Sequence, residues 1–176
     1  MFERIISKIK TGKTKSLGEK QNDALSRFIE NPFHNWIKSD KIIHRAFSIL
    51  FSSMPDNVLL HFQKKILICL KASGQQACTL TPPSNSEIII IFPDLEKLLK
   101  SASPFHGIAV LAHEIGHIIH NHSNMVINPI KAQIEADTIA HEMGFGKELL
   151  EQLLSFPETH EYNLRIRYLH SLLREI

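Results

Sequence analysis

The residues best suited to do chemistry are His113, Glu114 and His117, which fit the pattern H-E-x-x-H. Side chains four residues apart lie on one face of a helix, so the two histidines can bind one metal ion. Glu114 can then reach a water at that ion and act as a general base. Burying these three side chains among isoleucines is costly unless a partner compensates, and a metal ion does so. The motif therefore indicates a metal site that activates water.

The helix that must carry this motif is defined by its flanking residues. Apolar side chains occupy most of its circumference: Ile108, Val110, Leu111, Ile115, Ile118 and Ile119. This distribution indicates a buried helix. Ser103 as N-cap and Pro104 at the first helical position predict its start. A chance match in a core helix with satisfied histidines is the alternative, and the flanking signals favour metal binding.

Three runs rich in β-branched or apolar residues precede the motif and predict strands: Lys65–Lys71, Ala77–Thr81 and Glu87–Phe92. Ser73-Gly74 predicts a hairpin turn between the first two runs, which would place Cys69 opposite Cys78. We interpret these cysteines as reduced core thiols, with a cross-strand disulfide as the minor alternative.

Capping residues, prolines and glycines bound the predicted helices: 21–30, a helix capped by Asp40, Pro93 to Lys100, Ile130 to Met143, about Lys147–Ser155, and about His160 to Arg174. The predicted fold class is therefore α+β and mainly helical. We expect a small antiparallel sheet of about three strands to pack on the motif helix, and a second helix to complete the metal site.

We expect three parts along the chain. Residues 1–20 would form an N-terminal helix and polar linker, residues 21–57 a helical extension, and residues 58–176 the domain that contains the motif. Residues 2–9 place four apolar side chains on one helical face. Contact with a membrane surface or a partner is one interpretation, although packing on its own domain or fraying is more common for such an end.

Composition narrows the function classes. The chain has 176 residues, of which 43% are apolar, and a net charge of +2 from scattered charged residues. This balance argues against a nucleic-acid partner. No apolar run approaches the roughly 20 residues of a transmembrane helix, and the N-terminus lacks the apolar core of a signal peptide. The simplest expectation is a soluble cytoplasmic protein.

A catalytic zinc site needs a third protein ligand besides the two histidines. Metzincins supply a third histidine six residues after the second, but that position is Ser123 here. The helix after Pro129 offers Gln133, Glu135 and Asp137 as candidates.

Three motifs of this chain resemble those of the gluzincin zinc metallopeptidases, specifically the group of the HtpX and CAAX prenyl endopeptidases and their small soluble members, the minigluzincins. The first is AHEIGHIIHNH, which includes His122. The second is IEAD followed by a helical run to GFG, and the third is Thr159-His160 followed by Arg165-Ile166. The resemblance covers about residues 58–170.

The resemblance implies Zn²⁺ as the cofactor and a third ligand four residues before Asp137, with Asp137 supporting a ligating histidine. The family has Glu at that ligand position, whereas this chain has Gln133. A neutral amide would bind zinc more weakly and leave the bound water more acidic. Glu135 is the alternative ligand, but it lies about 200° around the helix from Gln133. The face shared with Asp137 favours Gln133.

The resemblance also implies that His160 or Tyr162 stabilises the oxyanion of a tetrahedral intermediate. The family's proline after this histidine is replaced here by Glu161. A helix-capping or surface role is the alternative for His160.

The expected function is a zinc-dependent metalloendopeptidase that hydrolyses peptide or protein substrates through a zinc-bound water, with Glu114 as general base. The alternative is a weakened or inactive peptidase-like scaffold that binds or regulates a partner. Gln133 supports that alternative, and the intact Glu114 opposes it. A regulatory peptidase of the ImmA/IrrE type is a related possibility, although no DNA-binding helix pair is evident.

Overall fold

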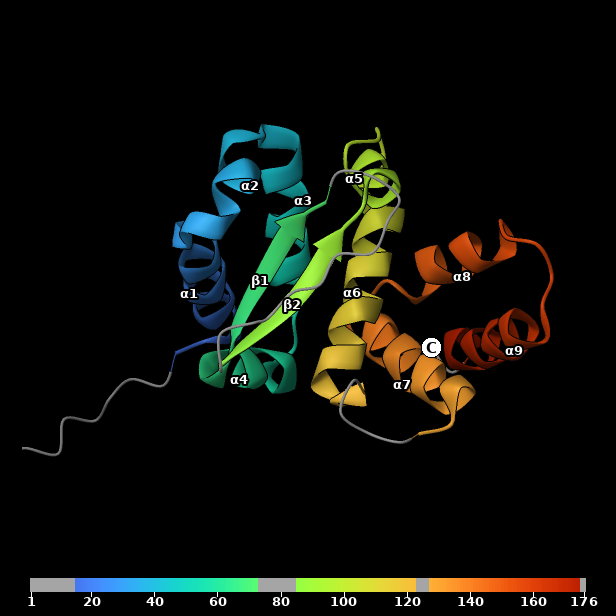
Figure 1. The fold of residues 1–176 in the computed structure, drawn as a ribbon. Helices are drawn as coiled ribbons and strands as arrows, with labels where there is room; N and C mark the ends of the chain where they lie inside the picture. Colours follow the sequence, from blue (N-terminus) through green and yellow to red (C-terminus); the bar gives the residue numbers. More distant parts are fainter. Residues whose placement is uncertain (1–14, 73–84, 123–126, 175–176) are drawn as a thin grey trace, which may run out of the picture.

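Helix α6 (Phe105–Ile119), which carries the H-E-x-x-H motif, lies between two groups of elements (Figure 1). The computed structural model describes residues 15–72, 85–122 and 127–174. Two strands and the N-terminal helices lie on one side of α6, and α7, α8 and α9 lie on the other. The architecture is α+β and mainly helical, so the predicted fold class is confirmed. The other elements are α1 (Leu17–Glu30), the 3-10 turn η2 (Pro32–His34), α2 (Asn35–Ser39), α3 (Lys41–Ser52), α4 (Asp56–Lys64), β1 (Ile66–Lys71), β2 (Ser86–Ile91), α5 (Pro93–Leu99), α7 (Pro129–Glu142), α8 (Gly146–Leu154) and α9 (His160–Arg174).

The sheet in the described residues has two strands, β1 and β2, which pair in parallel with Cys69 beside Ile89. The predicted antiparallel arrangement is wrong for this pair. Continuous apolar runs are typical of parallel strands buried on both faces, and this signal outweighs the local turn residues. The predicted strand at 77–81, the Ser73-Gly74 turn and Cys78 lie outside the described residues. Cys69 is a buried free thiol, and burial raises the pKa of this thiol.

The N-terminal helices differ from the prediction in two places. Helix α1 begins at Leu17, inside the predicted linker, because Ser16 and Glu19 form a reciprocal capping box. The hydroxyl of Ser16 accepts from the Glu19 amide, and the Glu19 carboxylate accepts from the Ser16 amide. Helix α4 was not among the predicted helices, and it starts directly after Pro55, its N-cap residue. Residues 2–9 lie outside the described range.

One hydrophobic core joins the N-terminal helices, the strands and α6 with the C-terminal helices α7, α8 and α9. Its large, fully buried members include Phe47, Leu50, Ile91, Ile108, Leu111, Ile115 and Leu169. Burial of each such side chain contributes about 1.5–3 kcal/mol. Helix α6 starts at Phe105 with Pro104 as N-cap and without the predicted Ser103 side-chain cap, so its position rests on this core contact. Among the described helices, none combines the length and apolar character that a membrane crossing requires.

Candidate metal centre

His113 and His117 lie one turn apart on the same face of α6. Their rings meet edge to face, and their Nε2 atoms are 3.1 Å apart. Two nitrogen ligands on a tetrahedral zinc ion, with bonds of about 2.0–2.1 Å, would be separated by roughly 3.3 Å. The two histidines therefore fit the spacing that a shared zinc ion requires.

Asp137 and Arg165 support His113 from α7 and α9. Oδ1 of Asp137 lies 2.8 Å from Nδ1 of His113, an electrostatic contact rather than an aligned hydrogen bond. Arg165 donates from Nε and Nη2 to the two carboxylate oxygens at 2.8 and 2.7 Å. Burial alone would raise the pKa of Asp137, but its contacts with His113 and Arg165 hold that pKa below its ordinary value. The ionised carboxylate favours a proton on Nδ1 of His113 and leaves Nε2 free to bind a metal.

His117 has a different support, formed by His122 and Glu135. Nδ1 of His117 is 2.8 Å from Nδ1 of His122, and Nε2 of His122 is 2.9 Å from Oε2 of Glu135. Burial, followed by the nearby His113 and His122, lowers the pKa of His117 to about 4. A neutral His117 can donate its Nδ1 proton to His122, and His122 can donate its Nε2 proton to Glu135. This tautomer leaves the Nε2 lone pair of His117 facing that of His113.

A cavity of about 970 Å³ lies beside the two histidines, walled by α5 to α9. His113, Glu114, His117 and Gln133 all line it. Glu114 has no hydrogen-bond or ion-pair partner among the residues that the structure describes, so its carboxylate is available to accept a proton. The arrangement places a free base beside two converging imidazoles.

A second cavity, of about 590 Å³, follows β2 and reaches His117. Ile88 and Ile90 line its strand side. Both cavities share Val110, Glu114 and His117, so they meet at the motif. The site therefore has room on both sides for an extended ligand.

The candidates for the third ligand and for the oxyanion donor lie in different positions relative to the cavity. Gln133 lines the cavity with His113 and His117, whereas the carboxylate of Glu135 contacts His122 instead. His160 is exposed at the first position of α9 and does not line the cavity. Tyr162 does line it, and its amide is held by the hydroxyl of Thr159 at 3.1 Å.

Two residues at this centre were not assigned a contact with it from the sequence. His122 belongs to the first motif without an assigned role, and in the structure it contacts His117. The local signal is Asn121, a residue type that can adopt a left-handed conformation. Such a residue directly after the helix end can turn the chain so that His122 points back toward His117. Arg165 belongs to the third motif, but the sequence assigns no role to this residue. Nothing in the sequence pairs it with Asp137, which is 28 residues away.

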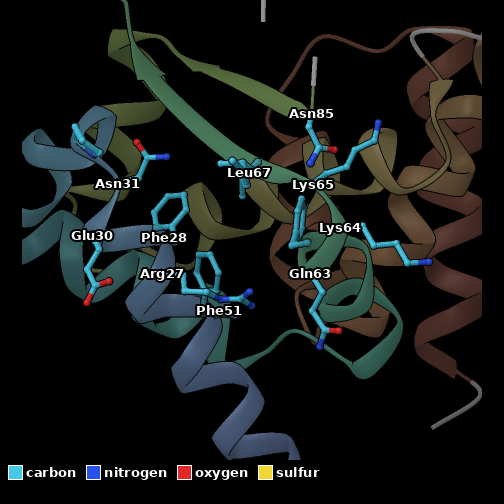
Figure 2. A pocket seen from close by; sticks show the side chains of 14 residues that line it. Arg27, Phe28, Glu30, Asn31, Phe51, Gln63, Lys64, Lys65, Leu67 and Asn85 are labelled. Atoms are coloured by element: carbon cyan, nitrogen blue, oxygen red, sulfur yellow. The ribbon is translucent and has the colours of Figure 1, made fainter. Parts of the chain in front are cut away.

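A third cavity is lined mainly by residues of α1, α4 and β1 (Figure 2). It measures about 420 Å³ and is lined by side chains such as Phe28, Phe51 and Leu67, with Arg27 and Lys64 among its polar residues. It shares no residue with the two cavities at His117. It therefore does not belong to the metal centre.

Residues 84–157 match the family model of peptidase family M48. This span contains β2, His113, Glu114, His117 and Asp137, and it ends before α9. The matched span is less than half of the chain, and it shows that this part is similar to a family of zinc metallopeptidases. No curated protein and no solved structure shows significant similarity to the chain.

Proposed function

We propose that this chain is a zinc-dependent metalloendopeptidase in which His113 and His117 bind the metal and Glu114 is the general base. The observation that carries the proposal is the 3.1 Å approach of the two Nε2 atoms beside a carboxylate without a partner among the described residues. The match to peptidase family M48 over residues 84–157 supports the same reaction class. The finer assignment, to the group of the HtpX and CAAX prenyl endopeptidases, rests on the resemblance of the three motifs.

Zinc, when bound, polarises a peptide carbonyl and makes water a better nucleophile at neutral pH. Glu114 accepts a proton from the attacking water and passes it to the leaving amine. Asp137 and the His122–Glu135 pair orient the two imidazoles, so their lone pairs need little rearrangement on binding. Arg165 keeps Asp137 ionised for this role.

Gln133 is the proposed third protein group at the metal. It lines the same cavity as the two histidines, and its amide oxygen is the donor that it can offer. A neutral donor leaves the centre with more positive charge than a carboxylate would. We therefore expect weaker zinc binding than at a site with two histidines and a glutamate.

Tyr162 is the proposed donor to the oxyanion that forms at the attacked carbonyl, because its position in the cavity wall suits this role better than the exposed His160. The peptide itself is proposed to lie along β2. The carbonyls of Asn85 and Ile91 accept from the amides of Ile66 and Ala72. Backbone groups alternate along a strand, so those of Ile88 and Ile90 point to the opposite edge of β2. An extended substrate can add to that edge and reach Glu114.

Metal analysis and proteolysis of the same preparation test the proposal. Purified protein should contain zinc, and it should cleave unfolded casein or a mixture of fluorogenic peptides. Glu114→Gln should keep the metal and lower the rate by about 10²- to 10⁴-fold. Glu142→Gln, an identical change at an exposed position of α7, is the matched control and should retain full activity. Activity that survives Glu114→Gln would overturn the assigned mechanism.

The second candidate is a peptidase-like scaffold that binds a partner without cleaving it. Gln133 in the cavity favours it, because the carboxylate expected from the family is absent at that position. The same experiment separates the two functions. A protein without zinc and without proteolysis, in which Gln133→Glu restores both, would establish the scaffold.

A further inference from the structure

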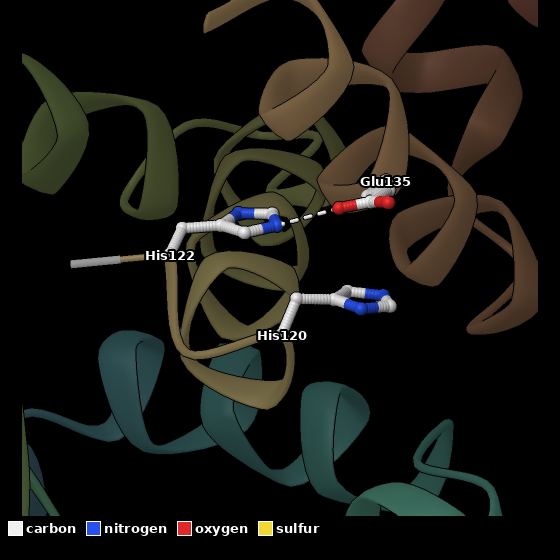
Figure 3. A group of neighbouring side chains, drawn as sticks. All are labelled: His120, His122 and Glu135. Carbon is white, nitrogen blue, oxygen red and sulfur yellow. Dashed lines mark hydrogen bonds and ion pairs between the residues drawn. The ribbon is translucent and has the colours of Figure 1, made fainter. Parts of the chain in front are cut away.

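A second group of side chains that can bind a metal, His120, His122 and Glu135, lies at the C-terminal end of α6 and on α7 (Figure 3). Ligand atoms of His120, His122 and Glu135 all lie within 4.8 Å of one another. The rings of His120 and His122 stack with centroids 5.4 Å apart and an interplanar angle of 10°. Within the described part of the chain, this is the only such group of three His, Cys, Asp or Glu side chains.

The backbone is shaped to bring these side chains together. His120 caps the C-terminus of α6, and Asn121 follows with φ of 55°, in the left-handed region that few residues other than glycine adopt. On a continuing helix, residues 120 and 122 would point about 200° apart. The left-handed turn instead lets His122 stack on His120 and reach Glu135 on α7.

We propose that His120, His122 and Glu135 bind a second divalent metal ion, most favourably zinc. Two imidazoles and one carboxylate are a donor set that zinc sites use, with a fourth position left for water. The C-terminal end of α6 carries partial negative charge, which favours a cation there. Lys131 lies 3.6 Å from Oε1 of Glu135, whereas Oε2 faces His122, so one oxygen remains directed at the site.

The second site contacts the first through His122 and His117, whose Nδ1 atoms are 2.8 Å apart. A neutral His122 that binds metal through Nε2 carries its proton on Nδ1. A neutral His117 that binds zinc through Nε2 does the same. Two N–H groups would then face each other, so occupation of the second site should weaken zinc binding at the first. This coupling rests on the proposed function, and linkage makes it reciprocal, typically by about 5- to 150-fold.

Zinc stoichiometry of the full chain tests the second site without reference to activity. Protein stripped with a chelator is dialysed against low-micromolar Zn²⁺, and bound metal is counted by elemental analysis. Wild type should bind two ions, and His120→Ala and Glu135→Gln should each bind one. His113→Ala, with His113→Gln as a milder second variant, should also bind one. His170→Ala removes an exposed histidine on α9 and should still bind two. Circular dichroism checks that each variant is folded.

The outcomes separate the two sites. If wild type and His120→Ala each bind one ion and His113→Ala binds none, the second site is wrong and the proposed metal centre stands. If His113→Ala binds one ion and His120→Ala none, the second site stands and the proposed function fails. A second ion that appears only at millimolar zinc is adventitious and overturns the inference. Competition with a chelator at saturating zinc measures the affinity of the first site. Tighter zinc binding in His120→Ala than in wild type supports the coupling, and equal binding overturns it.

Discussion

A Cβ atom added to Gly116 would lie 2.6 Å from Cα of Ala136, so helices α6 and α7 touch backbone to backbone at this point. Gly116 is the residue before His117, and Ala136 is the residue before Asp137. The close approach is therefore what brings the Asp137 carboxylate to within 2.8 Å of His113. The second variable position of H-E-x-x-H has a packing role here, because no side chain fits there.

Gly116→Ala should consequently damage both the fold and the metal centre. The added methyl group meets backbone atoms, which cannot move aside as a flexible side chain can, and overpacking of this kind costs about 1–3 kcal/mol or more. We expect a lower free energy of unfolding in denaturant titration and weaker zinc binding. Gly18→Ala is the control, because nothing lies within 4 Å of a Cβ there, and it should be neutral or stabilising by up to about 1 kcal/mol. A Gly116→Ala protein as stable as wild type would contradict the role of this contact.

Local periodicity explains what the sequence predicts well. The helical spacing of four places His113 and His117 on one face, and the structure shows their Nε2 atoms 3.1 Å apart. Capping and breaking residues locate most helices, and α9 spans the predicted His160 to Arg174. The face shared by Gln133 and Asp137 follows from the same geometry. These are all relationships within one turn or one helix.

Relationships between distant elements could not be predicted in the same way. The pairing of Arg165 with Asp137 leaves no local mark in the sequence. The direction of β2 relative to β1 is indicated only by their continuous apolar runs, which compete with the turn residues between them. The position of His122 depends on one left-handed residue, Asn121, and a continuing helix would have pointed His122 elsewhere. Each of these features depends on tertiary packing, which a single sequence specifies only through the whole chain.

Arg165 should be essential to the stability of the region around α7 and α9. Asp137 is fully buried, and Arg165→Met would leave it without a counter-ion, at a cost of about 3–5 kcal/mol. Adding Asp137→Asn to this variant removes the unpaired charge, so the double variant should lose less than the sum of the two single changes. Denaturant unfolding of all three proteins measures this coupling. Arg167→Met, an exposed neighbour on α9, should change stability by less than about 0.5 kcal/mol.

His34 should make the fold sensitive to acid. Its Nδ1 contacts the carbonyl of Phe28, and its Nε2 accepts from the amide of Cys69 at 3.0 Å. Burial lowers the pKa of His34, partly opposed by the Phe28 carbonyl. Below about pH 6.5 the unfolded chain therefore gains this proton before the folded protein does. Stability is complete above that pH and falls as the pH falls, by at most about 1.4 kcal/mol per pH unit for one proton.

Unfolding of metal-free protein at pH 7.5 and 5.5 checks this sign. His34→Gln should be less stable than wild type at pH 7.5 and should lose less on acidification, because the titrating group is gone. Other histidines titrate in both proteins, so the difference between the two isolates His34. An unchanged pH dependence in His34→Gln would rule out this source of acid sensitivity.

Two substitutions distinguish Tyr162 from His160 as the oxyanion donor. Tyr162→Phe removes only the hydroxyl of a side chain that lines the cavity. Loss of an oxyanion donor should reduce kcat by about 10²- to 10³-fold with little change in KM. His160→Ala alters an exposed side chain and should leave kcat within about twofold, because no contact with the cavity is lost. Steady-state kinetics on one fluorogenic peptide measure both. The opposite pattern would return the oxyanion role to His160.

Gln133→Glu should strengthen the metal centre. The change keeps the side-chain size and replaces a neutral amide oxygen with a carboxylate in the cavity that His113 and His117 line. Attraction between the carboxylate and zinc should raise the affinity by about tenfold or more, which corresponds to roughly 1.4 kcal/mol. Titration against a chromogenic chelator measures this affinity. Gln152→Glu adds the same charge to the wall of the same cavity from α8, so it reports the long-range effect of charge alone. A larger gain for Gln133→Glu than for Gln152→Glu places residue 133 at the metal, whereas equal gains would show that it acts only through its charge.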